Sequence, residues 1–257
     1  MTKGGVMRTL LVALLFAFGA QAWADPTQGV NYITEEFPPF NFKGDDGNPT
    51  GINTDILVEM FKKMGSKNSY RDIKLQPWVR GYRTTQEDGS MNILYSTTRT
   101  PGREKIFKWV GPLTDATNDI MVLKGNPKSV KIESDGDFGK YKYAVIRDDI
   151  GEQVLAKAGV KKSNLSHSTN FYAMVKKLQD GKVDAVSYNG TVAKWLLKRE
   201  GLKPADFDFV YSTKLGQHYF AFNKSIDDDV VEAHQKALDD IKADKALMDK
   251  ITGKYLK

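Results

Sequence analysis

A short pattern of elements occurs twice in this chain, and the repetition restricts the folds that it can adopt. Residues 87–94 read Glu-Asp-Gly-Ser-Met-Asn-Ile-Leu and residues 179–186 read Gln-Asp-Gly-Lys-Val-Asp-Ala-Val, so each copy is a turn followed by a short apolar run. A polar loop and the start of a helix follow each run. Strands that alternate with helices indicate a mostly parallel α/β sheet. We therefore expect two similar α/β lobes whose polar loops form opposing walls of one cleft.

The first half of the chain predicts the order βαβαβ. We expect strands at residues 30–34, 73–76 and 91–94, and helices at residues 54–64 and 80–87. The first helix has an apolar face at helical spacing and ends at a glycine. This order places helices on the faces of a mostly parallel sheet.

The second half predicts a further set of strands and helices. Strands are expected at residues 119–123, 143–146, 165–168, 183–186, 207–211 and 218–222. Helices are expected at residues 150–158, 170–178, 192–199, 227–242 and 245–255. The last two helices must then pack on one of the two lobes.

The first 24 residues have the features of a secretory signal peptide. Lys3 and Arg8 precede an apolar run at residues 9–20, which is too short to span a bilayer comfortably. Ala22 and Ala24 supply the small residues that a signal peptidase reads, so we predict cleavage before Asp25. We expect a periplasmic protein that is soluble after cleavage.

The composition argues against several other classes of protein. The chain has 257 residues and a formal net charge of +6. It has no cysteine, so neither a disulfide nor a lipid-modified cysteine is available. Because the basic residues are scattered among acids, we expect no nucleic-acid surface. The three histidines are isolated, and we predict no metal site, no cofactor and no set of catalytic residues.

Residues 95–104, Tyr-Ser-Thr-Thr-Arg-Thr-Pro-Gly-Arg-Glu, form the most distinctive polar segment. We expect a loop that follows a strand and leads into a helix at Pro101, because proline suits the first helical turn. Its hydroxyls and the guanidinium groups of Arg99 and Arg103 suit a small anion such as a carboxylate. The alternative is a surface loop with a capping threonine and two solvated arginines.

The chain also resembles the family 3 extracellular solute-binding proteins, the periplasmic receptors of polar amino-acid ABC importers. The matching motifs are spread over most of the chain after residue 24, in the order and spacing of that family. They lie at residues 37–40 (Phe-Pro-Pro-Phe), 49–57, 77–78 (Pro-Trp), 88–89, 100–103 (Thr-Pro-Gly-Arg), 111–113, 178–186 and 253–256.

This resemblance implies an α/β fold of the Venus-flytrap kind, periplasmic binding protein-like and of type II. Two mixed sheets flanked by helices form two lobes that close on a ligand. The first lobe is expected to comprise residues 25–118 and 223–257, and the second residues 119–222. The hinges are expected near residues 117–121 and 217–222.

The resemblance also implies the residues that bind the carboxylate end of the ligand. Arg103 corresponds to the family's carboxylate-binding arginine, although Arg99 nearby leaves open which of the two is used. The family's hydroxyl and backbone groups just before the arginine correspond to Ser96, Thr97 and Thr98. Its aromatic residue after the first strand corresponds to Phe37, and Trp78 lies on the same wall.

The opposite wall departs from the family. Asn189 stands where an aspartate commonly receives the ligand's ammonium group, and an amide cannot neutralise that charge. Asp148 and Asp149 stand where the family usually has Gly-Thr. We hypothesise that Asp149 replaces the missing charge. The alternatives are a ligand without an ammonium group and an Asn189 that only caps the following helix.

These observations predict a monomeric solute-binding protein that captures a small carboxylate-bearing ligand, an amino acid or a related polar metabolite. The closed form would dock on an inner-membrane ABC permease. Two alternatives stay open: a stand-alone sensor or scavenger, and a cleft enzyme that resembles cyclohexadienyl dehydratase. Such an enzyme needs a positioned acid–base group, for which the acidic candidates are Glu35, Glu36, Asp149 and Glu152.

Overall fold

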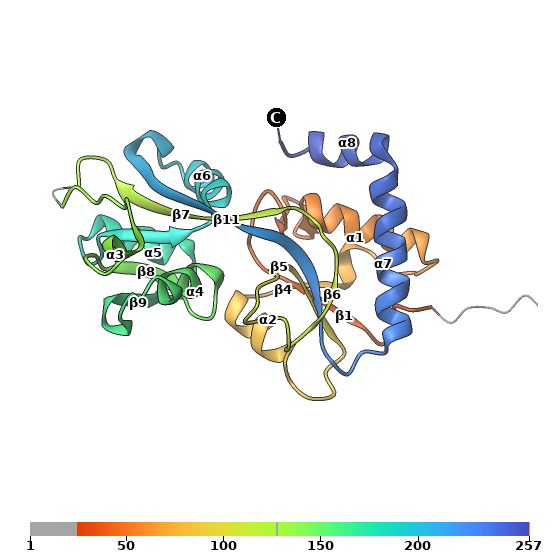
Figure 1. Ribbon diagram of the computed structural model, residues 1–257. Coiled ribbons are helices and arrows are strands. Elements are labelled where there is room, and N and C mark those ends of the chain that lie inside the picture. Colours follow the sequence, from red (N-terminus) through yellow and green to blue (C-terminus); the bar gives the residue numbers. More distant parts are fainter. Residues whose placement is uncertain (1–24, 127, 257) are drawn as a thin grey trace, which may run out of the picture.

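The computed structural model describes residues 25–126 and 128–256, and the predicted signal peptide lies outside this part. The chain forms two α/β lobes that are connected by two long strands, β7 and β11 (Figure 1). The predicted α/β class and the two-lobed architecture are therefore confirmed.

The first lobe is built on a parallel sheet with an antiparallel edge. β1 (Asn31–Thr34) lies between β4 (Ile73–Leu75) and β5 (Asn92–Thr98) and is parallel to both. β11 (Phe207–Phe222) continues the sheet antiparallel to β5, and β6 (Lys108–Val110) pairs with the end of β11. β1 and β5 are almost wholly buried, as expected for strands covered by helices on both faces.

Four helices belong to the first lobe: α1 (Ile52–Lys63), α2 (Trp78–Thr84), α7 (Asp228–Ala243) and α8 (Lys245–Gly253). α1 packs against both α7 and α8, so the two C-terminal helices cover the first lobe (Figure 1). Gly51 precedes α1 with φ of 119°, and a Cβ atom there would lie 2.5 Å from the main-chain oxygen of Phe40. Only glycine fits this close approach of two backbone segments.

The second lobe repeats the α/β arrangement. β8 (Tyr143–Ile146) is parallel to β9 (Leu165–Ser168) and to β10 (Ala185–Tyr188), and β10 is antiparallel to β7 (Asp115–Leu123). Every residue of β8 and β10 is buried. The sequence repeat thus places β5 and β10 in corresponding positions, each with a polar segment at its carboxyl end.

The helices of the second lobe lie around this sheet. They are α3 (Asp135–Phe138), α4 (Ile150–Lys157), α5 (Phe171–Gln179) and α6 (Gly190–Arg199). The predicted apolar face of α5 is buried, with Phe171, Met174, Val175 and Leu178 in the core. The remaining short elements are β2 (Phe42–Lys43), β3 (Pro49–Thr50) and the 3-10 turns Tyr70–Asp72, Lys162–Asn164 and Pro204–Asp206.

The prediction of two separate strands at residues 207–211 and 218–222 is wrong, because β11 is one strand of 16 residues. Its first part, from Phe207 to Gln217, pairs with β7, and its last part, from His218 to Phe222, pairs with β5. The intervening residues include Gly216, with φ of 100°, and a register shift between Lys214 and Gly216. Gly216 and the polar side chains around it suggested that the strand ends there. The neighbouring β7 nevertheless pairs with β11 on both sides of the register shift, so the strand continues.

The predicted loop and helix at residues 95–104 also differ from the structure. Tyr95 to Thr98 continue β5, because β11 pairs with Thr97 and Thr98. No helix begins at Pro101; residues 101–106 form consecutive turns, in which the N–H of Arg103 donates to Thr100 and that of Ile106 donates to Arg103. The predicted helix at residues 80–87 is shifted as well, since α2 begins at Trp78, directly after Pro77.

Within residues 25–126 and 128–256, no helix has both the length and the apolar character that crossing a bilayer requires.

Candidate functional site

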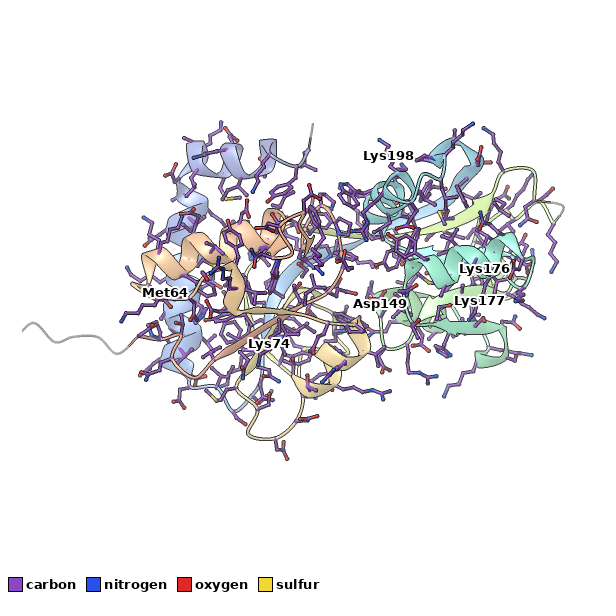
Figure 2. The ribbon with its side chains drawn as sticks, turned by 180° about the vertical axis from the view of Figure 1, so that it is seen from behind. Met64, Lys74, Asp149, Lys176, Lys177 and Lys198 are labelled. Atoms are coloured by element: carbon purple, nitrogen blue, oxygen red, sulfur yellow. The ribbon has the colours of Figure 1, made fainter. Side chains whose placement is uncertain are left out.

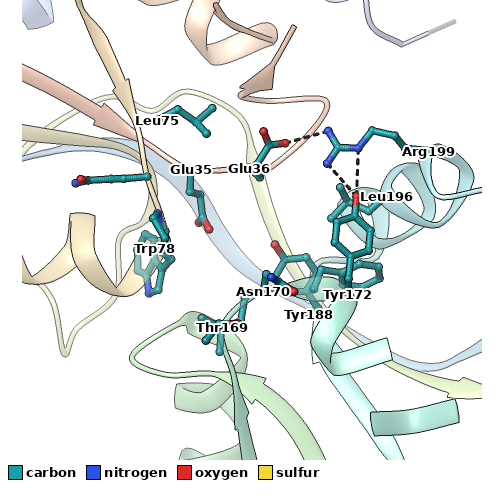
Figure 3. Close-up of a pocket in the computed structure, with 14 residues that line it drawn as sticks. Glu35, Glu36, Leu75, Trp78, Thr169, Asn170, Tyr172, Tyr188, Leu196 and Arg199 are labelled. Carbon is teal, nitrogen blue, oxygen red and sulfur yellow. Dashed lines mark hydrogen bonds and ion pairs between the residues drawn. The ribbon is translucent and has the colours of Figure 1, made fainter. Parts of the chain in front are cut away.

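A cavity of about 490 Å³ lies between the two lobes (Figure 3). Its first-lobe wall consists of Glu35, Glu36, Leu75, Gln76, Pro77 and Trp78, and its second-lobe wall consists of Ile146, Thr169, Asn170, Phe171, Tyr172, Tyr188, Leu196 and Arg199. The volume falls in the range of sites that bind small molecules.

The fold brings these residues together at the carboxyl ends of strands. Glu35 directly follows β1, Pro77 follows β4, Thr169 follows β9 and Tyr188 is the last residue of β10. In open α/β sheets ligands bind at this edge, because the polar groups of the loops there are not used in strand pairing. The two lobes place these edges opposite each other. Of the two polar segments that follow the repeated strands, only the second reaches the cavity, through Tyr188, whereas residues 95–104 do not line it.

Arg103 is buried at the margin of the cavity, with 1% of its surface exposed. Its guanidinium carbon lies 5.1 Å from the ring centroid of Trp78 and 5.0 Å from that of Tyr82. Nη1 donates to the main-chain oxygen of Thr98 at 3.1 Å, and Nη2 donates to that of Asp148 at 2.9 Å. Because Asp148 belongs to the second lobe, Arg103 connects the two lobes.

Gln153 of α4 also faces this guanidinium. With its amide oxygen turned toward Arg103, it accepts from Nη2 at 3.0 Å and from Nε at 3.2 Å. Protein oxygens thus occupy most of the five N–H donors of Arg103 in the closed cleft.

Arg99 lies apart from the cavity. Its side chain is exposed and forms an ion pair with Glu104 at 2.5 Å. Its guanidinium carbon lies 5.3 Å from the ring centroid of Tyr219 and 5.7 Å from that of Trp109. Neither arginine lines the cavity, but only Arg103 packs on a residue that does, the ring of Trp78.

The hydroxyl-rich segment before Arg103 is buried behind the cavity wall. Ser96, with φ of 62°, donates its hydroxyl to the side-chain oxygen of Asn41 and accepts from the amide of Asn53 at 2.9 Å. The hydroxyl of Thr97 donates to Leu94 at 3.4 Å. Thr98 contributes its main-chain oxygen to Arg103. In the closed cleft these residues hold the backbone and the arginine, and none of them lines the cavity.

The two predicted aromatic residues take different positions. Trp78 lines the cavity and stacks on Tyr82, with ring centroids 5.1 Å apart. Phe37 lies deeper and packs edge-to-face against Tyr188 at 6.0 Å and against His218 at 5.5 Å. Since Tyr188 belongs to the second lobe, Phe37 forms part of the apolar contact between the lobes.

Asp149 lies at the edge of the second lobe that faces the first (Figure 2). It is the N-cap of α4 and accepts from the N–H of Ile150 at 2.6 Å. Burial raises the pKa of its carboxyl, although the guanidinium of Arg103 and the capped N–H oppose this. Asp148 beside it has φ of 60° and forms an exposed ion pair of 3.3 Å with Arg83 of the first lobe.

Asn189 serves as the N-cap of α6. Its amide oxygen accepts from the N–H of Val192 at 3.0 Å, and its amide nitrogen donates to the main-chain oxygen and the hydroxyl of Thr117 at 3.1 and 3.2 Å. Both polar atoms of the side chain thus have protein partners. The structure corresponds to the capping alternative for this residue.

Glu35 is a cavity residue that the sequence indicated only as an acid–base candidate of an enzyme. Its side chain points into the cavity from the end of β1 (Figure 3), and its carboxylate accepts no hydrogen bond from the described residues. Burial and the nearby carboxylate of Asp149 raise its pKa well above the ordinary value, and Arg103 partly offsets them. Its place directly after the first strand is the signal that could have identified it.

An ion pair closes the other side of the cavity (Figure 3). Nη1 of Arg199 in α6 lies 3.0 Å from a carboxylate oxygen of Glu36 in the first lobe. Nε and Nη2 of the same arginine donate to the hydroxyl of Tyr172 at 3.2 and 2.9 Å. Glu36 and Arg199 are far apart in the sequence, so no local pattern could have indicated this contact.

Metal binding finds no support in the part of the chain that the structure describes, where no three His, Asp or Glu side chains gather at ligand distance. His218 is buried beside Phe37 and accepts or donates a hydrogen bond with the hydroxyl of Thr114 at 3.0 Å. Burial lowers its pKa to about 3, so the ring is neutral.

Comparisons with known proteins extend these observations. The probable histidine-binding protein of Campylobacter jejuni subsp. jejuni serotype O:2 is 26% identical over 220 residues, which is 85% of this chain and 81% of the relative. The L-cystine-binding protein TcyJ of Escherichia coli (strain K12) is 26% identical over 144 residues, 52% of each protein.

A similar solved structure is that of an ancestral arginine-binding protein bound to arginine. It is 28% identical, covers 90% of this chain and 100% of its own, and has a TM-score of 0.72. The substrate-binding protein of an amino acid ABC transporter, 22% identical with a TM-score of 0.71, covers 89% of this chain and 99% of its own and shares the fold.

The family described as bacterial extracellular solute-binding proteins, family 3, matches residues 30–257. This match covers both lobes and confirms the resemblance that the sequence motifs indicated. The chain therefore belongs to family 3 of the bacterial extracellular solute-binding proteins.

Proposed function

We propose that this solute-binding protein binds a small carboxylate-bearing ligand, an amino acid, in the cavity between its lobes and delivers it to an ABC permease. The observation that carries the proposal is the cavity itself, which is lined by the strand-end loops of both lobes. One lining residue, Trp78, packs against the buried cation of Arg103. The relatives named for histidine, cystine and arginine support an amino acid as the ligand.

Arg103, rather than Arg99, is proposed to hold the ligand's carboxylate. A guanidinium presents donors in a planar fork that matches a carboxylate. In the structure, the main-chain oxygen of Asp148 and the amide of Gln153 accept from this fork. A ligand carboxylate would replace these oxygens, after the cleft has opened far enough to admit it.

The division of the chain at residues 118 and 222 remains a prediction. We propose that the hinge consists of residues 115–118 of β7 and 213–217 of β11, because these residues pair only with each other. Residues of β7 from Asp119 onward also pair with β10, and residues of β11 from His218 onward pair with β5. Rotation about these two strands, which connect the lobes, would open the cavity while each lobe keeps its structure.

A panel of the twenty L-amino acids, tested by thermal shift and then by calorimetry, checks the proposed function. A ligand at 100 times its Kd stabilises the folded protein by about 2.7 kcal/mol, which a thermal shift detects. Each ligand found is then compared with its deaminated analogue. A loss of affinity shows that the ligand's ammonium group is recognised, as proposed for Asp149, whereas equal affinity argues against any ammonium site. A panel without any stabilising amino acid would overturn the proposal.

The cleft enzyme is the second candidate, and one observation favours it. The raised pKa of Glu35 in a closed cavity is what a proton-transferring carboxyl group requires. Incubation of every stabilising ligand with the protein, followed by NMR of the solution, separates the two functions. A ligand recovered unchanged supports a binding protein, and a converted ligand supports the enzyme.

Export to the periplasm, removal of residues 1–24 and a monomeric state are part of the same proposal. The family of extracellular proteins supports export. N-terminal sequencing of the protein isolated from cells should begin at Asp25, and light scattering should give the mass of one chain.

A further inference from the structure

We infer that the cleft selects an amino acid with a cationic side chain, and that Glu35 is the residue that sets this preference. The inference rests on the proposed function and specifies the ligand class of the same cavity.

The first argument is the position of Glu35. Its carboxylate lies in the cavity and has no hydrogen-bond donor among the described residues (Figure 3). An unpaired carboxylate is costly to remove from water, so a closed cleft favours either its protonation or a cation beside it. A ligand that carries a cation supplies the missing partner.

The second argument is the balance of charge around the cavity. Glu36 is paired with Arg199, and Asp148 is paired with Arg83, so neither pair leaves a net charge. Apart from Glu36, the charged groups that act on Glu35 are the carboxylate of Asp149, which raises its pKa, and the guanidinium of Arg103, which lowers it, so that Glu35, Asp149 and Arg103 form one interacting set. This set has a net charge of −1 when both acids are ionised. A zwitterionic ligand leaves that charge unchanged, whereas an amino acid of net charge +1 neutralises it.

The third argument is that the arginine at the other side of the cavity does not compensate Glu35. The donors of Arg199 are directed to Glu36 and to the hydroxyl of Tyr172. These donors of Arg199 therefore form no hydrogen bond with Glu35.

The fourth argument is the aromatic lining. Trp78 and the aromatic residues Phe171, Tyr172 and Tyr188 of the second lobe line the cavity. Aromatic faces attract cations through the ring quadrupole and exclude water, which strengthens the pairing of the ligand with Glu35. A guanidinium or an ammonium group at the end of an aliphatic side chain therefore suits both the aromatic walls and the negative charge of Glu35.

Calorimetry with L-arginine and L-citrulline tests the inference on the unaltered protein. Citrulline has nearly the shape of arginine, but a neutral urea group replaces the guanidinium. We expect arginine to bind at least 100-fold more tightly than citrulline. Equal binding of the two would overturn the preference for a cation while leaving the proposed function intact. Failure of every amino acid in the panel would instead overturn the proposed function.

The variant Glu35→Gln tests the role of the residue. It should reduce the arginine-to-citrulline ratio at least 10-fold, mainly by weakening arginine binding. The matched control is Glu87→Gln, which removes the same charge from an exposed position outside the cavity and should leave the ratio unchanged. An unchanged ratio in a folded Glu35→Gln protein, as judged by circular dichroism, would exclude Glu35 as the determinant.

Discussion

The guanidinium of Arg103 donates a hydrogen bond of 2.9 Å to the main-chain oxygen of Asp148, from the first lobe to the second. The same guanidinium packs on Trp78, which lines the cavity, so it lies between a contact of the two lobes and the cavity wall. The proposed role of Arg103 as the carboxylate-binding residue leads to the first prediction.

Replacing Arg103 by Ala should weaken the binding of carboxylate ligands by about 100-fold, because a charge-assisted, partly bidentate pair is worth up to about 3 kcal/mol. Calorimetry with the best amino acid of the panel measures the change. Arg99→Ala should change the affinity by less than about threefold, since that side chain is exposed and paired with Glu104. The reverse result, with Arg99 essential and Arg103 dispensable, would contradict the assignment.

Replacing Asn189 by Ala should lower the free energy of unfolding by about 1 kcal/mol, the usual effect of losing a helix N-cap. The affinity for the ligand should change little, because both polar atoms of Asn189 bind protein groups. Urea unfolding and calorimetry measure the two quantities separately. An affinity that falls more than about tenfold, with stability unchanged, would show that Asn189 contacts the ligand directly.

Replacing Glu36 by Gln should shift the ligand-free protein toward an open form, because it removes the ion pair with Arg199 across the cavity. The pair is partly exposed, so its contribution is at most about 1 kcal/mol, or roughly a fivefold change in the ratio of closed to open protein. Small-angle X-ray scattering should show a larger radius of gyration. Arg83→Gln, at the more exposed pair with Asp148, should have a smaller effect. Equal scattering of all three proteins would argue against the pair as a latch.

Acid should destabilise the protein through two buried histidines. Burial lowers the pKa of His218 to about 3 and that of His234 to about 4, whereas both titrate near 6.5 in the unfolded chain. The unfolded chain therefore binds more protons below pH 6.5. The stability from each neutral histidine is complete above that pH and falls by about 1.4 kcal/mol per pH unit below it.

Burial keeps His234 neutral, although its hydrogen bond to Val230 opposes this by raising the pKa. Its Nδ1–H donates to the main-chain oxygen of Val230 at 2.7 Å, so Nε2 accepts the hydroxyl of Tyr32 at 2.7 Å. Urea unfolding at pH 7.0 and 5.5 tests the prediction, and His234→Gln should show a smaller loss on acidification than the unaltered protein. The same pH dependence in both proteins would contradict it.

Replacing Glu35 by Gln should stabilise the ligand-free protein above pH 7. The carboxyl has a raised pKa in the folded state, so its protonated form favours folding at low pH, and this stabilisation is lost as the pH rises through the folded pKa. Asp149, Arg103 and Glu36 are the charged groups that act on it. The neutral amide avoids the loss, so urea unfolding should show a gain at pH 8 and none at pH 4. A less stable variant at pH 8 would indicate that Glu35 is paired in solution.

The fold was accessible from the sequence to a large extent. The two copies of the strand and loop pattern became β5 and β10, and the apolar face of α5 is buried as its spacing predicts. Such patterns are local, because the burial of one helix face or one strand follows from side chains that are close in the sequence. The continuity of β11 was missed because hydrogen bonds from β7, a distant segment, carry the strand past Gly216.

The candidate site was accessible only in part. The sequence brought attention to Arg103 and Trp78; Trp78 lines the cavity, and Arg103 packs directly against its ring. It also suggested Ser96 and Thr97, whose hydroxyls are turned toward the protein interior. Whether a hydroxyl points to a cavity or to the core depends on what packs against it, and the sequence of its own strand does not contain that information.

By itself, the sequence determined the α/β class, the repeated lobes and the family, because these depend on the periodicity and order of residues along the chain. Only the tertiary structure decided that Arg103 and not Arg99 packs on Trp78 of the cavity wall, that Asn189 is a cap, and that Glu35 and Asp149 act on each other. Each of these facts is a relation between the two lobes or between a loop and its packing partners. The physical reason is that burial and electrostatic fields act through space, across residues that the chain brings together only when it folds.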